Sequence, residues 1–416
     1  MSSDKNLTER FYRALKKRSE TENMPGIVIL ESQLDDHPES KDTYIAALPE
    51  KKISLFSDKT GDNTWNLLGD LIRDDNGWLF GYLGYDLKNS VFDRLTSENR
   101  VLIDTPDLFM FSPSVLIRIR DDEAVFLKGE PFEPPVPSYA NEFEIKGLKP
   151  LITQQEFKKN VERIQHQIKE GDFYEINYTY PITAQFSGDN FSLFRKMSDV
   201  NPVPFAAYIE FDDTAVCSVS PERFLKKSGN TIMSEPIKGT SGRSGLPEED
   251  EQLKSQLMNE KNRAENLMIV DLVRHDFAQV CETGSVKVSK LYEIQSFDTV
   301  HQLISRVEGR LSEKYKSVDA LRACFPMGSM TGAPKYRVLK EIEKYEIYKR
   351  GVYSGAIGYI TPDDDFDFNV VIRSAIVKNN KLVFPVGGAI TSDSDPDDEW
   401  RETEIKSRAL TDAAKM

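Results

Sequence analysis

Short apolar segments rich in β-branched and aromatic residues run through this sequence, and their order constrains the fold more than any other feature. Before residue 120 they include GIVILES, TYIAAL and SVLIRIR, and after residue 350 they include GVYSGAIGYI and KLVFPVGGAI. Runs of this kind are typical of β-strands. They stand in groups with helices inserted between them, instead of alternating strictly with single helices. This order favours an α+β protein with antiparallel sheets.

A proline-rich stretch divides the chain. Residues 129–150 hold five of the 21 prolines, and proline fixes φ and removes a backbone donor, which favours an extended connector. We therefore expect an N-terminal subdomain at 1–128, the connector at 129–150 and a larger domain at 151–416. A helix should open the larger domain, because Phe157, Val161 and Ile164 recur at helical spacing.

Composition excludes several classes of protein. Lys and Arg number 54 against 68 Asp and Glu, a net charge of −14, which is unfavourable for binding nucleic acid or an anionic membrane. Cys217, Cys281 and Cys324 lie far apart without CxxC spacing, which argues against a disulfide framework or a zinc–cysteine site. The N-terminal segment has no apolar signal core, and no apolar run is long enough to span a bilayer. We expect a cytoplasmic protein.

The final helix carries a stripe of charge. Asp395 and Pro396 predict its N-terminus. Glu399, Glu402 and Lys406 follow at intervals of three and four residues, which places them within about 60° of one another on a helical wheel. A solvated helix face with one Glu–Lys pair would produce the same pattern.

A second carboxylate lies on an apolar helix face. We expect one long helix over 247–280, and Glu265 shares its face with Leu272 and other apolar residues. An unpaired buried carboxylate costs several kcal/mol, so an arginine, a metal ion or a raised pKa should compensate it. If Glu265, Glu399 and Glu402 face one cavity, their carboxylate oxygens would form an all-oxygen set of ligands, which suits Mg²⁺.

Three other residues are candidates for chemistry. Lys238 in SEPIKGTSGR is a surface charge unless it is enclosed, in which case desolvation lowers its pKa and frees a nucleophilic amine. Glu222 in SVSPERFL ends a strand and could reach the same cleft. Arg373, within the expected strand NVVIRSAIV, needs an anionic partner from the protein or a substrate. These residues alone do not name a reaction.

In this order, the segments resemble the chorismate-utilising enzyme family of anthranilate, aminodeoxychorismate, isochorismate and salicylate synthases. The resemblance covers about 150–412 and implies an α+β fold like that of anthranilate synthase component I, with two large, mostly antiparallel sheets packed as a sandwich and helices on the outer faces. VILES at 28–32 and NPVPF at 201–205 are similar, more weakly, to segments that contribute to a buried site able to hold tryptophan. The resemblance rests on SPERFL, PIKGT, AENLMIVDLVRHD, FPMGSMTGAPK, GVYSGAIGYI, VVIRSA, VGGAI and EWRET.

The resemblance also implies roles for individual residues. Glu265 and Glu402 match direct magnesium ligands, and Glu399 matches a ligand acting through water. Lys238 would be the nucleophile and Glu222 the acid. The positions matching substrate contacts are Thr240, Tyr353, Arg373, Gly387, Gly388 and Lys406.

Two positions distinguish the branches of the family. Isochorismate and salicylate synthases use a lysine as base where this chain has Glu175, whereas Lys238 resembles the aminodeoxychorismate branch. The resemblance then implies amination of chorismate at C4, through a covalent Lys238 intermediate, with ammonia from a separate glutamine amidotransferase subunit. An anthranilate synthase component I is the alternative. Departures at Asn262, His275 and Gln302 leave open a non-catalytic subunit that binds chorismate or tryptophan.

Overall fold

The computed structural model describes residues 3–34, 42–56, 63–92, 95–136, 142–297 and 300–415. Its α-helices within these ranges are α1 (Ser3–Glu22), α3 (Thr64–Asp75), α4 (Gln154–Lys169), α5 (Asn190–Val200), α6 (Pro247–Gln256), α7 (Glu260–Ala278), α8 (Ser317–Cys324), α9 (Lys335–Tyr345) and α10 (Pro396–Thr411). Its strands are β1 (Ile27–Glu31), β2 (Thr43–Leu55), β3 (Leu79–Leu83), β4 (Leu108–Arg120), β5 (Glu123–Lys128), β6 (Phe143–Pro150), β7 (Glu175–Gly188), β8 (Phe205–Phe211), β9 (Thr214–Ser220), β10 (Arg223–Ser228), β11 (Thr231–Ser234), β12 (Ile237–Gly242), β13 (Lys287–Ser296), β14 (Val300–Arg310), β15 (Gly332–Ala333), β16 (Ala356–Ile360), β17 (Phe366–Val370), β18 (Ser374–Lys378) and β19 (Lys381–Ile390).

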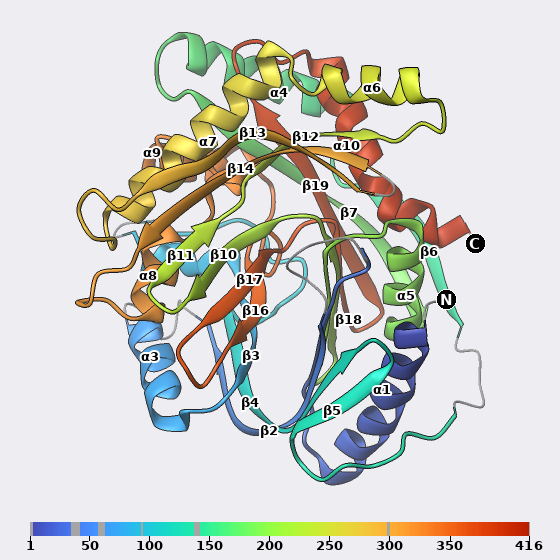
Figure 1. Ribbon diagram of the computed structural model, residues 1–416. Coiled ribbons are helices and arrows are strands. Elements are labelled where there is room, and N and C mark those ends of the chain that lie inside the picture. The colour runs from blue at the N-terminus through green and yellow to red at the C-terminus, as the bar shows by residue number, and fades with distance from the viewer. Residues whose placement is uncertain are drawn as a thin grey trace.

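Antiparallel pairing connects these strands. The longest regular register joins β7 and β19, from Lys381 opposite Gln185 to Ile390 opposite Ile176. The expected α+β class with antiparallel strands is confirmed. The arrangement differs from the expected pair of sheets in one respect: hydrogen bonding joins the nineteen strands of the described chain into one strongly curved sheet (Figure 1).

Strands from both sides of the proline-rich stretch share this sheet. β1 pairs with β8, placing Ile27 opposite Glu210, and β3 pairs with β16, placing Leu83 opposite Ala356. The connector itself ends in β6, which pairs with β7, while its residues 137–141 lie outside the described residues. The division at 129–150 therefore stays a prediction about folding units, since the two parts are joined through the sheet.

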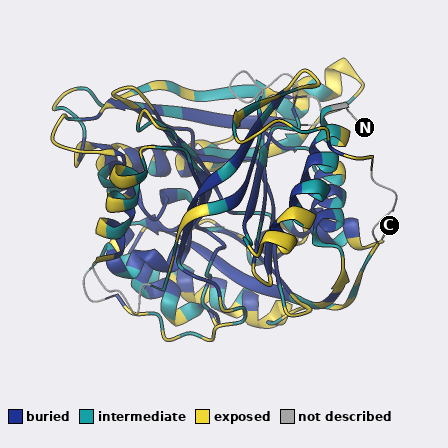
Figure 2. Ribbon diagram, turned by 90° about the horizontal axis from the view of Figure 1, so that it is seen from below, coloured by how far each residue is buried: buried dark blue, intermediate teal, exposed yellow. Residues whose placement is uncertain are grey.

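The helices lie outside the strands, and the most buried residues lie between these layers (Figure 2). Phe157, Val161 and Ile164 of α4 are completely buried, as their spacing predicts. The Trp400 ring on α10 stacks on Tyr180 of β7 at 5.3 Å and meets Phe157 edge-on at 5.5 Å between ring centroids. These aromatic contacts fix α10, which carries much of the candidate site, against the sheet. No helix in the described ranges is long and apolar enough to cross a membrane.

Two local predictions were wrong. The expected long helix over 247–280 is broken after α6, because the side chain of Asn259 accepts a hydrogen bond from the backbone N–H of Asn262 and starts α7 as a new helix. The expected strand NVVIRSAIV is also interrupted. Arg373 lies between β17 and β18 with φ +50°, in the left-handed region that non-glycine residues seldom adopt.

Candidate active site

One cavity of about 590 Å³ brings the predicted site residues together. Residues of β12, β19, α7 and α10 contribute to its lining, and these four elements are labelled in the upper half of Figure 1. Gly388 follows Gly387 on β19, and a Cβ at Gly388 would lie 3.3 Å from Oε2 of Glu399. Ten of the eleven predicted site residues line the cavity: Glu222, Lys238, Thr240, Glu265, Tyr353, Arg373, Gly387, Glu399, Glu402 and Lys406.

Lys238 is enclosed, but the expected effect on its pKa was wrong. Its side chain is 12% exposed, and Nζ lies 3.0 Å from Oε1 of Glu175 and 3.8 Å from Oε2 of Glu265. Desolvation, the largest influence, lowers the pKa as predicted, but attraction to Glu175 and Glu265 outweighs it. The pKa of Lys238 is therefore raised, and its amine must lose a proton before it can act as a nucleophile.

Glu222 has the properties of a general acid. It follows β9, is 7% exposed, and burial raises its pKa from 4.5 to about 7, although a hydrogen bond with Ser329 and the nearby Lys238 partly oppose this shift. A carboxyl group that is protonated near neutral pH can donate a proton to a leaving group. Its position on the cavity wall supports the expectation that Glu222 and Lys238 reach one cleft.

Three predicted carboxylates converge from α7 and α10. Oε1 of Glu265 is buried and has no hydrogen-bond partner among the described residues. Desolvation raises the pKa of both Glu265 and Glu399, whereas Lys406, 2.6 Å away, lowers the pKa of Glu402. Lys261 Nζ lies between two of them, 3.0 Å from Oε1 of Glu399 and 3.9 Å from Oε1 of Glu265.

This cluster has the donor chemistry that Mg²⁺ requires. Hard divalent cations bind carboxylate oxygens, and an orphaned buried oxygen on Glu265 fits such an ion. Within the part of the chain that the structure describes, however, no group of three His, Cys, Asp or Glu side chains is spaced closely enough to enclose a metal. The residue types fit magnesium, while lysines pair with these carboxylates in the arrangement observed.

The cavity lining also contains cationic groups that suit an anion. Arg373 lines the cavity, and no described carboxylate forms an ion pair with it; its Nη1 donates a hydrogen bond to Oδ1 of Asn201 at 3.5 Å. Desolvation lowers its pKa. Lys406 also borders the cavity and donates a hydrogen bond to the carbonyl of Gly387. Strained backbone is common at binding sites, and the left-handed conformation of Arg373 aims this guanidinium from a strand junction.

Sequence reasoning missed several residues of this site. Glu175 was considered only as a branch marker, although it contacts Lys238 directly. Lys261 lines the cavity from the first turn of α7, and its interval of four from Glu265 was a signal that could have identified it. Asn262, named above only as a departure from the family, lines the cavity beside it. His301 is buried and bonds with Ser296 and Asp250, away from the cavity lining.

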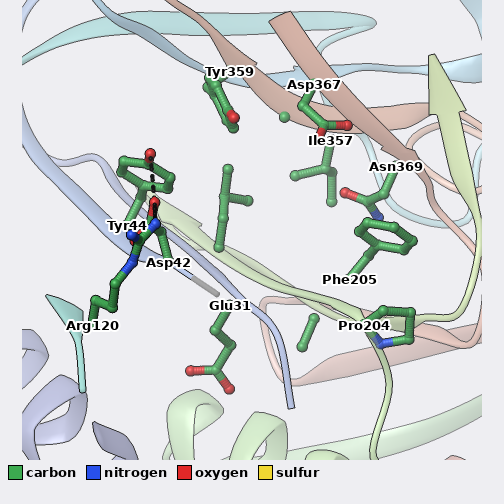
Figure 3. A pocket seen from close by; sticks show the side chains of 13 residues that line it. Glu31, Asp42, Tyr44, Arg120, Pro204, Phe205, Ile357, Tyr359, Asp367 and Asn369 are labelled. Carbon is green, nitrogen blue, oxygen red and sulfur yellow. Dashed lines mark hydrogen bonds and ion pairs between the residues drawn. The ribbon is translucent and has the colours of Figure 1, made fainter. Parts of the chain in front are cut away.

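A second cavity of about 250 Å³ is lined in part by the segments VILES at 28–32 and NPVPF at 201–205. Glu31 from VILES and Pro204 and Phe205 from NPVPF line it together, and Figure 3 shows them facing a common space. Arg195 donates hydrogen bonds to both oxygens of Glu31, at 2.6 and 2.8 Å. The aromatic side chains suit a small ligand with an apolar body, while the acidic residues Glu31, Asp42 and Asp367 are each paired with an arginine.

Comparison with known proteins agrees with this geometry. The family model described as chorismate binding enzyme matches residues 28–412. A chloroplastic aminodeoxychorismate synthase of Arabidopsis thaliana is 37% identical over 78% of this chain, but the chain spans only 35% of that relative. Aminodeoxychorismate synthase component 1 of Klebsiella aerogenes is 35% identical over 79% of this chain and 75% of its own length. Anthranilate synthase component I of Streptococcus pneumoniae has a TM-score of 0.79 at 26% identity, covering 91% and 93% of the two chains.

Proposed function

Since this chain belongs to the family of chorismate-binding enzymes, we propose that it converts chorismate and ammonia into 4-amino-4-deoxychorismate, the role of an aminodeoxychorismate synthase component I. One observation carries the proposal. Lys238, with its amine in reach of a ligand, lines the same cavity as the weakly acidic Glu222 and the three carboxylates Glu265, Glu399 and Glu402.

In this proposal the cavity binds chorismate through its two carboxylates. Arg373, which has no described carboxylate partner, and Lys406 supply positive charge, and a guanidinium can bind a carboxylate through two hydrogen bonds. Tyr353, Thr240 and the backbone at Gly387 and Gly388 would complete the contacts. Binding both ends of the substrate fixes the ring between Lys238 and Glu222.

The first displacement forms a covalent bond. The Lys238 amine attacks C2 of the chorismate ring, the two ring double bonds shift, and the C4–O bond breaks. Glu222 gives its proton to the departing hydroxyl, so that water leaves and a Glu222 carboxylate remains. Its pKa of about 7 keeps a large share of the acid form available near neutral pH.

In the second displacement, ammonia adds to C4 and the Lys238 amine leaves C2. Ammonia attacks C4, the double bonds return, and the C2–N bond breaks with its electron pair moving to Lys238. The new C4 ammonium gives one proton to Glu222, which restores the acid. Two displacements at one ring thus replace a single difficult substitution, as in other nucleophilic catalysis.

Magnesium would be held by this chain's own carboxylates. We propose that Glu265 and Glu402 bind it directly and that Glu399 binds it through water, because these oxygens suit a hard cation and the buried Oε1 of Glu265 accepts no hydrogen bond from a described residue. When bound, Mg²⁺ supplies a Lewis acid for the ring carboxylate of chorismate.

A separate glutamine amidotransferase subunit would supply the ammonia. The name component 1 of the Klebsiella relative supports a partner subunit. We also propose tryptophan as a ligand of the second cavity, because Glu31, Pro204 and Phe205 line it together. A Kd for tryptophan that is unaffected by Phe205→Ala would contradict this assignment.

The reaction can be tested without the partner. The protein is incubated with chorismate, Mg²⁺ and an ammonium salt at alkaline pH, with and without an aminodeoxychorismate lyase. We expect 4-aminobenzoate only when the lyase is present. Anthranilate fluorescence in its absence would instead establish the alternative, an anthranilate synthase component I, for which the similarity to the Streptococcus structure is the favouring observation.

Lys238→Ala separates catalysis from binding. We expect this variant to bind chorismate and to form no product. If the wild-type protein itself binds chorismate or tryptophan and forms no product under any of these conditions, a non-catalytic binding subunit is the better description.

A further inference from the structure

Glu175 is the most thoroughly buried charged group near the cavity, and nothing in the reaction described above uses it. It is 1% exposed. Oε1 accepts a hydrogen bond from Lys238 Nζ at 3.0 Å, while Oε2 is buried and has no described hydrogen-bond partner. Among the described residues, Lys238 is the one cation within ion-pair distance of Glu175. A buried carboxylate is costly unless it is paired, so the two residues depend on each other.

The backbone holds Glu175 rigidly. It is the first residue of β7 and lies opposite Ala333 of β15. On either side, Tyr174 N–H donates to the carbonyl of Ala333 at 2.8 Å and Asn177 N–H donates to the carbonyl of Thr331 at 2.7 Å. Gly332 has φ +142°, and a Cβ there would lie 2.0 Å from the Glu175 carbonyl oxygen, so only glycine allows this close approach.

Two carboxylates lie within ion-pair distance of Lys238 Nζ. Glu175 is 3.0 Å from Nζ, whereas Glu265, a proposed magnesium ligand, is 3.8 Å away. Without Glu175, the flexible lysine would move onto Glu265, because an ammonium group remains in a cavity lined by carboxylates. Such a move would withdraw the nucleophile from the substrate and compete with the metal for one of its ligands.

We propose that Glu175 is a positioning residue for Lys238: it holds Nζ toward the substrate ring and away from Glu265. This inference rests on the proposed function. It also completes the proton balance of that reaction. One proton passes from Lys238 Nζ to Glu175 Oε1 as the lysine amine forms its bond to C2. The same proton returns to Nζ when the C2–N bond breaks, which restores both groups after each turnover.

The experiment compares Glu175→Leu, which removes the acceptor, with Glu175→Gln, which keeps an oxygen that can accept a hydrogen bond from Nζ. Glu341→Gln is the control, since Glu341 is completely buried and paired with Lys344 on α9, outside the cavity lining. Steady-state kinetics with chorismate and ammonium give kcat and KM. Intact-protein mass spectrometry after mixing with chorismate alone measures the Lys238 adduct, which weighs chorismate less one water.

We expect Glu175→Leu to lower kcat about 100-fold at an unchanged KM for chorismate, the loss produced by misplacing a reacting group by ~1 Å, and to form adduct correspondingly more slowly. Glu175→Gln should retain about tenfold more activity than Glu175→Leu, and the control should match the wild type. Adduct formation by Glu175→Leu at the wild-type rate, or a Glu175→Gln variant no better than Glu175→Leu, would overturn the inference.

Metal binding tests the same arrangement independently of turnover. Mn²⁺ titration followed by electron paramagnetic resonance should show about threefold weaker binding in Glu175→Leu, the scale of a modest ion pair, because Lys238 then occupies Glu265. Unchanged Mn²⁺ affinity would contradict the part of the inference that concerns Glu265. A wild-type protein that makes no product, together with weakened Mn²⁺ binding in Glu175→Leu, would reject the proposed function and keep the positioning role.

Discussion

Replacing Glu222 by glutamine should make the protein more stable and nearly inactive. In the native state Glu222 has a pKa of about 7, against a usual value of 4.5, because it is buried. Between these pH values the native state binds more protons than the unfolded state, so stability falls as the pH rises through this window. The full difference corresponds to about 3 kcal/mol. Glutamine carries no charge to bury, so Glu222→Gln should recover this free energy.

The gain in the free energy of unfolding of Glu222→Gln must increase with pH. From the same two pKa values, Glu222→Gln should raise the free energy of unfolding by less than about 1 kcal/mol at pH 5 and by about 3 kcal/mol at pH 8. Urea unfolding of the wild type and the variant at both pH values measures this difference. Glu341→Gln is a contrasting control, because that carboxylate lies 2.8 Å from Lys344 and 3.2 Å from Arg337, and its loss should destabilise the protein.

The same group should control the rate. If Glu222 is the acid, kcat/KM for the wild type falls tenfold per pH unit above about pH 7, measured at a fixed concentration of unprotonated ammonia. In Glu222→Gln, kcat should fall by about 10²- to 10⁴-fold. A stability gain of equal size at pH 5 and pH 8, or an alkaline limb that persists in the variant, would refute the assignment of the raised pKa to Glu222.

Three further substitutions test the site and its supports. Gly388→Ala should weaken Mn²⁺ binding about tenfold, because its Cβ would lie 3.3 Å from Oε2 of Glu399. Unchanged Mn²⁺ affinity in a spectroscopic titration would show that Glu399 does not take part in binding the metal. Phe157→Ala should lower the free energy of unfolding by about 3–5 kcal/mol, since this ring of α4 is completely buried against β7 and α10. Urea unfolding measures this loss, and a loss below about 3 kcal/mol would contradict the packing role of the ring. Arg195→Met should cost about 3–5 kcal/mol by leaving Glu31 buried and unpaired, and adding Glu31→Leu should restore most of it; equal losses in the single and double variants would argue against the pair.

Local patterns predicted the position of a helix and the face it turns to the cavity where one element carries the signal. The start of α10 at Asp395 and Pro396 follows from capping chemistry, and the side chain of Asp395 does accept hydrogen bonds from the first turn. The stripe of Glu399, Glu402 and Lys406 faces the cavity, as helical geometry allows. Such features depend on residues within one or two turns of each other, so the sequence contains most of the information needed.

Features that depend on distant segments could not be predicted in this way. Glu175 and Lys238 are 63 residues apart, and their contact requires β7, β12 and β15 to be assembled first. The wrong direction expected for the Lys238 pKa has the same origin, since desolvation follows from enclosure but the opposing carboxylates come from other elements. The turn at Arg373 was missed because the apolar run around it predicts a strand on both sides, and the interruption appears only in the backbone.

The charges around the cavity explain why substrate and metal belong together in the proposed reaction. With Glu222 protonated, the four remaining carboxylates balance four cations, while Asp398 and Arg401 at the rim pair with each other. Chorismate adds two negative charges, and leaving them uncompensated in an enclosed cavity would cost several kcal/mol. A divalent cation restores neutrality, so each of these two ligands favours binding of the other. The balanced groups are Lys238, Lys261, Arg373 and Lys406 against Glu175, Glu265, Glu399 and Glu402.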